Sequence, residues 1–262
     1  MRVDSSLSAP VPPVCERRWA SGVAALDAVL GGGLAYGCLH EVYAAEAQDC
    51  AAAAGFAAAL AAGMAQDDGG SGQTVLWLRA HRAVEIGGVL QAGGLGELGL
   101  KPEQAVLGLV ADRLLLLRSA VDALRSAALG ALIVEGWGPM PELDLTASRR
   151  LVLAARQSGV PLFLLRIDAA PVPSAAQTRW QVAAAASLPL PGEAPGPPAF
   201  AVELLRQKAG PCGQAWRLEW DRDRHKFDEA TLPGAALPVP RSRPAAERGT
   251  GALRPDRTRH AA

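Results

Sequence analysis

The chain alternates short, almost wholly apolar runs with longer stretches suited to helices, and this alternation limits its fold more than any other feature. A strand that is apolar on both faces must be covered on both faces, as in a parallel sheet between two helix layers. We therefore expect an α/β fold with a parallel sheet flanked by helices. The predicted strands are Leu39–Tyr43, Thr74–Leu78, Leu114–Leu117, Ala131–Glu135 and Pro161–Leu165, and the predicted helices are Cys50–Ala65, Arg82–Ala92, Ala120–Leu129 and Leu145–Ser158.

The pattern changes after Asp168. A loop interrupted by prolines, Ala169–Ala176, comes before two further apolar runs, Phe200–Leu205 and Ala215–Trp220. In the second run large apolar residues alternate with charged ones, which is typical of a half-buried strand. The two runs predict an antiparallel hairpin added to the parallel sheet.

Both ends of the chain differ in composition from the middle. Residues 1–20 contain prolines that break regular structure, so they are predicted to be a flexible lead before a core at 21–227. The segment 228–262 is rich in Pro, Ala and Arg and is predicted to be a disordered basic tail. We expect this tail to be solvated, and its arginines, among them Arg241 and Arg243, are alternatively candidates for weak contact with DNA or an acidic partner.

Composition bounds the location and the partners of the protein. Lys+Arg and Asp+Glu both number 26, so no global charge draws the chain to nucleic acid or to a membrane. The N-terminus lacks the apolar core of a secretory signal, and the Ala-rich run Ala51–Ala65 is shorter than the roughly 20 residues that span a bilayer. We therefore expect a cytoplasmic protein. Its four cysteines are scattered, without metal-ligand spacing, and are expected to be reduced thiols: Cys15, Cys38, Cys50 and Cys212.

The segment 26–43 resembles the lead-in to the ATP site of the RecA/recombinase superfamily. Asp27, the triple glycine at 31–33, Gly37 and Glu41 match that lead-in at their spacing. The resemblance implies a RecA-like sheet, with the phosphate-binding loop immediately after the first core strand. The alternative is an ordinary glycine-rich turn before a strand.

In that superfamily the next residues form the loop GxxxxGK[ST], whose backbone and lysine hold the phosphates and whose hydroxyl holds magnesium. Here Ala44 and Asp49 stand at the glycine positions, Cys50 replaces the lysine, and Ala51 replaces the hydroxyl residue. A Cβ at a glycine position resists the loop conformation, and the missing lysine and hydroxyl remove a charge and a metal ligand. We therefore expect a degenerate nucleotide site, no bound cofactor and no ATPase activity.

Acidic residues add to this loss. Glu46 and Asp49 place carboxylates where a polyphosphate would lie, and like charges at ~4 Å repel by about 4 kcal/mol at an effective dielectric of 20. Asp49 is predicted instead to cap the helix that begins at Cys50.

The other catalytic positions point the same way. His81 aligns with the glutamate that positions water in the RecA family, and Arg166 aligns loosely with the nucleotide-sensing glutamine. Glu135, the magnesium-side acid, is retained, and without the loop we expect it to hydrogen-bond the following segment rather than hold a metal. His40 is expected to be a satisfied core histidine. No other catalytic motif and no metal site is predicted.

Three further stretches are similar to the ImuA family. They are the run from His40 to Leu60, the run from Arg149 to Pro161, and the hairpin strands from Phe200 to Asp221. The resemblance covers roughly residues 20–230. ImuA proteins are bacterial, damage-inducible accessory factors of translesion DNA synthesis, also similar to the SulA group of SOS-linked division inhibitors.

The resemblance implies a non-catalytic protein that acts through protein contacts. Its expected partners are an ImuB-type relative of the Y-family polymerases and RecA itself, with weak or indirect DNA contact, no membrane partner and association with the nucleoid after DNA damage. The candidate contact elements are Trp137, in the segment after Glu135, and the basic tail. Tryptophans often dominate interface energy, although packing under the sheet edge is an equal alternative for Trp137.

Three other functions stay open. A divergent ATPase would bind ATP through an unorthodox loop. A SulA-like division inhibitor would cause filamentation. A direct single-strand DNA binder would depend on the basic tail and show strong salt dependence.

Overall fold

The computed structural model describes residues 17–67, 73–126, 128–187, 189–192 and 194–230. Most of the predicted lead, most of the predicted tail, and Arg241 and Arg243 lie outside them. The described chain forms a nine-stranded sheet in the order β11-β10-β9-β8-β3-β7-β6-β4-β5 and a small two-stranded sheet of β1 and β2. No described helix is both long and apolar enough to cross a bilayer.

Six strands of the large sheet run parallel, as the apolar runs predict. β3 lies at the centre and pairs with β7 on one side and β8 on the other. Except for the edge strand β5, which is largely exposed, these strands are buried at their centres, since helices cover both faces. The parallel strands are β3 (Leu39–Ala44), β4 (Thr74–Ala80), β5 (Ala105–Val110), β6 (Leu129–Trp137), β7 (Leu162–Ile167) and β8 (Thr178–Ala184).

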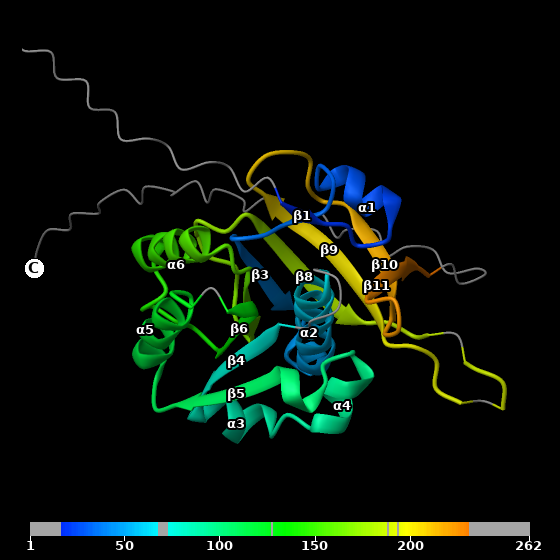
Figure 1. The fold of residues 1–262 in the computed structure, drawn as a ribbon, viewed down its shortest axis with the longest axis horizontal. Coiled ribbons are helices and arrows are strands. Elements are labelled where there is room, and N and C mark those ends of the chain that lie inside the picture. The colour runs from blue at the N-terminus through cyan, green and yellow to red at the C-terminus, as the bar shows by residue number, and fades with distance from the viewer. Residues whose placement is uncertain (1–16, 68–72, 127, 188, 193, 231–262) are drawn as a thin grey trace, which may run out of the picture.

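Two helix layers sandwich this sheet (Figure 1). α2 packs on one face, and α5 and α6 pack side by side on the other. The helices are α1 (Ala24–Val29), α2 (Cys50–Gln66), α3 (His81–Gly87), α4 (Ala92–Glu97), α5 (Arg113–Ala123) and α6 (Leu145–Ser158), with short 3-10 turns η1 (Ala47–Asp49) and η2 (Pro102–Gln104).

α2 buries an unusually small-residue surface. Most of its 17 residues are alanines, and from Phe56 to Ala65 every position is buried. Gly63 faces Trp19, and a Cβ at Gly63 would lie 2.3 Å from that indole ring. The helix therefore packs on the sheet through its backbone and methyl groups more than through long side chains.

The C-terminal part confirms the predicted hairpin and enlarges it. β9 and β10 pair antiparallel, and β8 joins them to β3. A further strand extends the sheet through Asp228 and Glu229, where the sequence predicts the start of the tail. Its Phe227 is fully buried in the core, which explains why the order continues. The antiparallel strands are β9 (Ala199–Gln207), β10 (Ala215–Asp221) and β11 (Lys226–Glu229).

Three predicted elements are wrong. The predicted helix Ala120–Leu129 is helical only at its start, because α5 ends at Ala123 and Leu129 already begins β6. Leu114–Leu117 is part of α5 and not a strand, because the Asp112 carboxylate accepts a hydrogen bond from Leu115 N at 2.8 Å and starts a helix there. The edge strand is β5, which comes just before it. The predicted helix Arg82–Ala92 ends early, at Gly87, because Gly88 takes a positive φ of 73°, and the next helix begins only at Ala92.

The N-terminal segment is anchored earlier than predicted. β1 (Arg18–Trp19) pairs with β2 (Leu34–Ala35), and Trp19 is fully buried. The triple glycine makes this pairing possible: Gly33 has a φ of 115°, and a Cβ there would lie 2.1 Å from Trp19 O. These glycines therefore shape the close approach of two chain segments.

Candidate functional site: the β3–α2 loop and the strand ends

The loop between β3 and α2 occupies the position predicted for phosphate binding. Strand β3 ends at Ala44, and the turn η1 leads directly into Cys50 at the start of α2. None of residues 44–51 has a positive φ. The loop thus has a shape that residues with a Cβ adopt without strain, as its lack of glycine requires.

Side chains within the loop bond to one another and to β8. The Asp49 carboxylate accepts hydrogen bonds from Ala184 N at 2.9 Å and from Glu46 N at 3.3 Å. The Glu46 carboxylate accepts from Asp49 N and from Gln48 Nε2. The predicted cap on α2 is wrong in detail: Asp49 holds the N-cap position, but its side chain makes no capping bond to α2 and closes the preceding turn instead.

Glu135, at the carboxyl end of β6, is buried with 2% of its surface exposed. Its Oε1 accepts hydrogen bonds from Arg79 at 2.8 Å and from the Trp137 indole at 2.7 Å, and its Oε2 accepts from the Trp77 indole at 3.0 Å. Both oxygens of the retained acid are therefore bonded within the protein. The predicted bond to the following segment is present, through Trp137.

Arg79 is a site residue that the sequence analysis missed. It lies on β4 beside Glu135, and it also donates to the carbonyl oxygens of Gly88 at 2.8 Å and Ala83 at 3.2 Å, which ties α3 to the sheet. The period of two in β4 could have revealed it. Arg79 falls on the same face as Val75 and Trp77, and a charge at an inward position needs a partner.

A cavity of about 290 Å³ lies between α2 and the chain from Gly87 to Leu98. Glu135 and Arg79 line it, together with Cys50, Ala51 and Trp137. Most of its other lining groups are alanine, glycine and aliphatic side chains. The structure thus brings four of the predicted site residues to one cavity and leaves Ala44, Glu46 and Asp49 outside its lining.

Trp137 is half-buried, and its ring packs against α3, where a Cβ at Gly87 would lie 2.5 Å from it. The segment after it is anchored on both sides. Arg113 donates to Trp137 O at 3.1 Å, and Arg166 donates to Gly138 O at 3.0 Å. His81, by contrast, is exposed at the start of α3.

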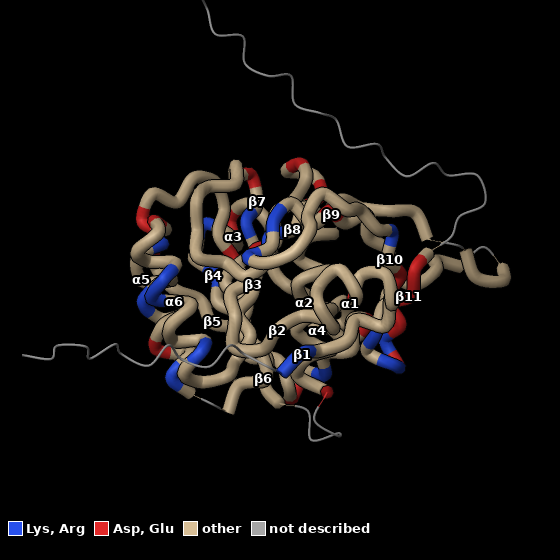
Figure 2. The backbone as a smooth tube through the Cα atoms, turned by 90° about the horizontal axis from the view of Figure 1, so that it is seen from above, with Lys and Arg blue, Asp and Glu red and all other residues tan. Residues whose placement is uncertain are grey.

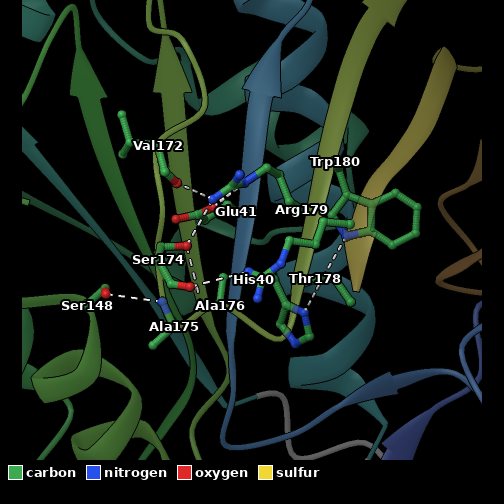
Figure 3. Close-up of polar contacts among 11 residues, drawn as sticks. His40, Glu41, Ser148, Val172, Ser174, Ala175, Ala176, Thr178, Arg179 and Trp180 are labelled. Atoms are coloured by element: carbon green, nitrogen blue, oxygen red, sulfur yellow. Dashed lines mark hydrogen bonds and ion pairs between the residues drawn. The ribbon is translucent and has the colours of Figure 1, made fainter. Parts of the chain in front are cut away.

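A second buried ion pair lies on the opposite face of the sheet (Figure 3). Glu41 on β3 is fully buried, and its Oε2 accepts a hydrogen bond from Arg179 Nε on β8 at 2.7 Å. Arg179 also donates to Val172 O and to Ser174 Oγ. One arginine therefore ties the β7–β8 loop to the neighbouring strands β3 and β8.

Two more polar side chains crowd this region. Burial raises the pKa of Tyr43, and it lowers the pKa of Arg166. Arg166 is 2% exposed, and among the described residues its Nε and Nη1 have no hydrogen-bond partner.

His40 is fully buried, as expected of a core histidine. Its ring stacks on Phe163, and its two nitrogens lie 2.7 Å from Thr178 Oγ1 and 2.9 Å from Ala35 O. Burial lowers its pKa to about 4, so the ring is neutral at physiological pH. Among the described residues, no group of His, Cys, Asp and Glu could hold a metal ion.

No protein-family model and no curated protein matches the chain. The fold does match solved structures, and one of them is the crystal structure of the RadB recombinase. That likeness has a TM-score of 0.51 at 17% identity, and it covers 81% of this chain and 100% of the RadB chain. The fold of this protein is RecA-like, as the predicted parallel sheet with an added antiparallel hairpin implies.

Proposed function

We propose that this protein is a RecA-like accessory factor of damage-induced translesion DNA synthesis that works without nucleotide turnover. The RecA-like fold supports the first part of this proposal, and the similarity of three sequence stretches to the ImuA family supports the second. The partners are an ImuB-type polymerase relative and RecA.

One observation carries the non-catalytic part: the bonding of Glu135. In a RecA-type ATPase the acid at this strand end must be free to organise magnesium. Here Arg79 and two indole N–H groups occupy both carboxylate oxygens. A metal would have to displace a buried ion pair, which costs several kcal/mol, and the loop that should bind phosphate lacks a lysine.

The fold suggests how such a protein acts. A RecA-type subunit surface that never changes with nucleotide state offers a constant docking shape. It would recruit the polymerase assembly to RecA-coated or stalled DNA, or limit growth of the RecA filament. The half-buried Trp137 edge and the tail arginines Arg241 and Arg243 are the candidate contacts.

The first experiment is calorimetry of the full chain with ATP and magnesium, using RecA as the positive control. We expect no binding at millimolar ATP. A second variant sharpens this test: A44G/D49G/C50K/A51T restores both glycines, the lysine and the hydroxyl residue, and we expect it still to bind ATP far more weakly than RecA, because Arg79 keeps Glu135 occupied. Micromolar binding by the native chain would contradict the proposal.

The partners need a separate test. We expect the purified chain to retain the ImuB-type protein or RecA in a pull-down, with or without ATP. Retention of neither partner would overturn the accessory role even if ATP does not bind. Filamentation of cells on expression, with no change in damage-induced mutagenesis, would favour a division inhibitor instead.

A further inference from the structure

Five arginines lie on or just after the two helices, α5 and α6, that cover the face of the sheet opposite α2. α6 buries Ser148, Leu151, Ala154 and Ala155, so its arginines point away from the core. α6 contains no acidic residue, and α5 contains one. Figure 2 shows the blue segments along both helices. We call this surface the arginine face, and its members are Arg118, Arg125, Arg149, Arg150 and Arg156.

Most of these charges are unpaired. Of these five arginines, only Arg125 has an acidic partner within the described chain. That partner is Asp122 at 3.2 Å, and the pair is exposed to solvent. The turn between β10 and β11 is the opposite case. There Arg222 pairs with Glu97 at 2.9 Å, and Arg224 pairs with Asp228 at 2.9 Å. The chain is neutral overall, but its positive charge is uncompensated on the helices.

Helix geometry arranges these charges in two rows. Arg149 and Arg156 are seven residues apart, which is two turns or about 10.5 Å along the axis. Arg118 on α5 and Arg125, two residues beyond the end of that helix at Ala123, form the second row. Packed helices lie about 8–10 Å apart, so the rows form a compact, positively charged patch. A single acidic side chain is too small to neutralise it.

The chemistry of the face favours a nucleic-acid backbone over a protein. Protein interfaces are centred on an apolar core depleted of charge, often with aromatic anchors. α5 and α6 carry no aromatic residue. Their exposed large apolar side chains are Leu114, Leu115 and Leu145, at the starts of the helices, and Leu153, which lies between Arg150 and Arg156. Guanidinium groups bind phosphate oxygens through paired hydrogen bonds. Without aromatic rings there is no platform for stacking unpaired bases, which favours duplex over single strands.

We propose that the arginine face binds the phosphate backbone of double-stranded DNA without reading its sequence. The proposal does not depend on the accessory role or its protein partners, because it rests on the charge and shape of α5 and α6. It also differs from the predicted contact through the tail, which lies on other residues.

The test measures the anisotropy of a labelled duplex of about 20 base pairs, titrated with the full chain at several salt concentrations. We expect R149A/R150A to weaken binding at least ten-fold near 100 mM salt. Each lost phosphate contact lowers the slope of log K against log salt by about 0.9, so the slope should fall by about 2. The matched control R222A/R224A removes the same charge and should change affinity less than two-fold.

Other variants keep the proposal open to contradiction. R149K/R150K preserves the charge and should restore affinity to within about three-fold, which a folding defect would not allow. Unchanged duplex binding in R149A/R150A would overturn the proposal. So would loss of binding only when the chain is cut after Ala230, which leaves β11 intact, or an R149A/R150A variant that loses a protein partner but keeps its DNA affinity.

Discussion

Glu135 and Glu41 are both buried in the same sheet, yet their hydrogen bonds are satisfied to different degrees. Glu135 faces α2 and accepts three hydrogen bonds, which engage both of its oxygens. Glu41 faces the other layer; its Oε2 is bonded by Arg179, and among the described residues its Oε1 has no partner. The Glu135 carboxylate would keep hydrogen bonds to both oxygens after losing Arg79, whereas the Glu41 carboxylate depends on Arg179 alone.

The largest effect is expected from breaking the dependent pair. R179M leaves Glu41 as an unpaired buried charge and releases Val172 and Ser174, and it should lower the free energy of unfolding by about 3–5 kcal/mol. Urea denaturation measures the loss, and limited proteolysis should show cleavage in the 168–177 loop. The double variant E41L/R179M should lose less free energy of unfolding than R179M alone, because it leaves no unpaired buried charge. If the loss in the double variant equals the sum of the losses in E41L and R179M, the two side chains do not stabilise the fold as a pair.

Breaking the well-supported pair should cost less. R79M removes one donor from Glu135, but the indoles of Trp77 and Trp137 still bond both oxygens. We expect a loss of about 2–3 kcal/mol in the free energy of unfolding, measured under the same conditions as R179M. A loss larger than that of R179M would mean that the indole donors do not support the carboxylate.

The smallest expected effect on stability comes from the protonation of His40, which precedes Glu41 on β3 and is buried in its neutral form. Its pKa is about 4 in the folded protein, below the 6.5 of an exposed histidine. The unfolded chain therefore takes up a proton below pH 6.5, which the folded chain takes up only near pH 4. Acidification to pH 5 should cost about 2 kcal/mol of stability through this group. Stability between pH 7 and 5 should fall less in H40Q than in the native chain.

The sequence was informative where one physical rule dominated. Continuous apolar strands predicted the parallel sheet, and α6 was predicted at its observed bounds, because Asp144 caps it and Gly159 ends it. The run Leu114–Leu117 failed because four leucines suit a strand or a helix equally, and the capping bond of Asp112 decided between them. β8 was missed because prolines before it hid the alternation of Arg179 and Gln181 with Trp180 and Val182.

At the candidate site, the missing nucleotide-binding residues could be predicted from the sequence, but the ion pairs formed there could not. The missing lysine and hydroxyl can be read at Cys50 and Ala51. The bond from Arg79 to Glu135 joins residues 56 positions apart, and the pair Glu41–Arg179 joins residues 138 apart. Such pairings depend on the order of strands in the sheet, which local patterns do not contain.

The alanines of α2 have a consequence for how this chain is compared with others. In a sequence they look like the least informative residues of the protein. In the fold, Ala57, Ala58, Ala59, Ala61 and Ala62 have no exposed surface, so each larger side chain would need room that the sheet does not leave. The alanine-rich sequence of α2 is thus among the parts of the chain that tolerate the fewest substitutions.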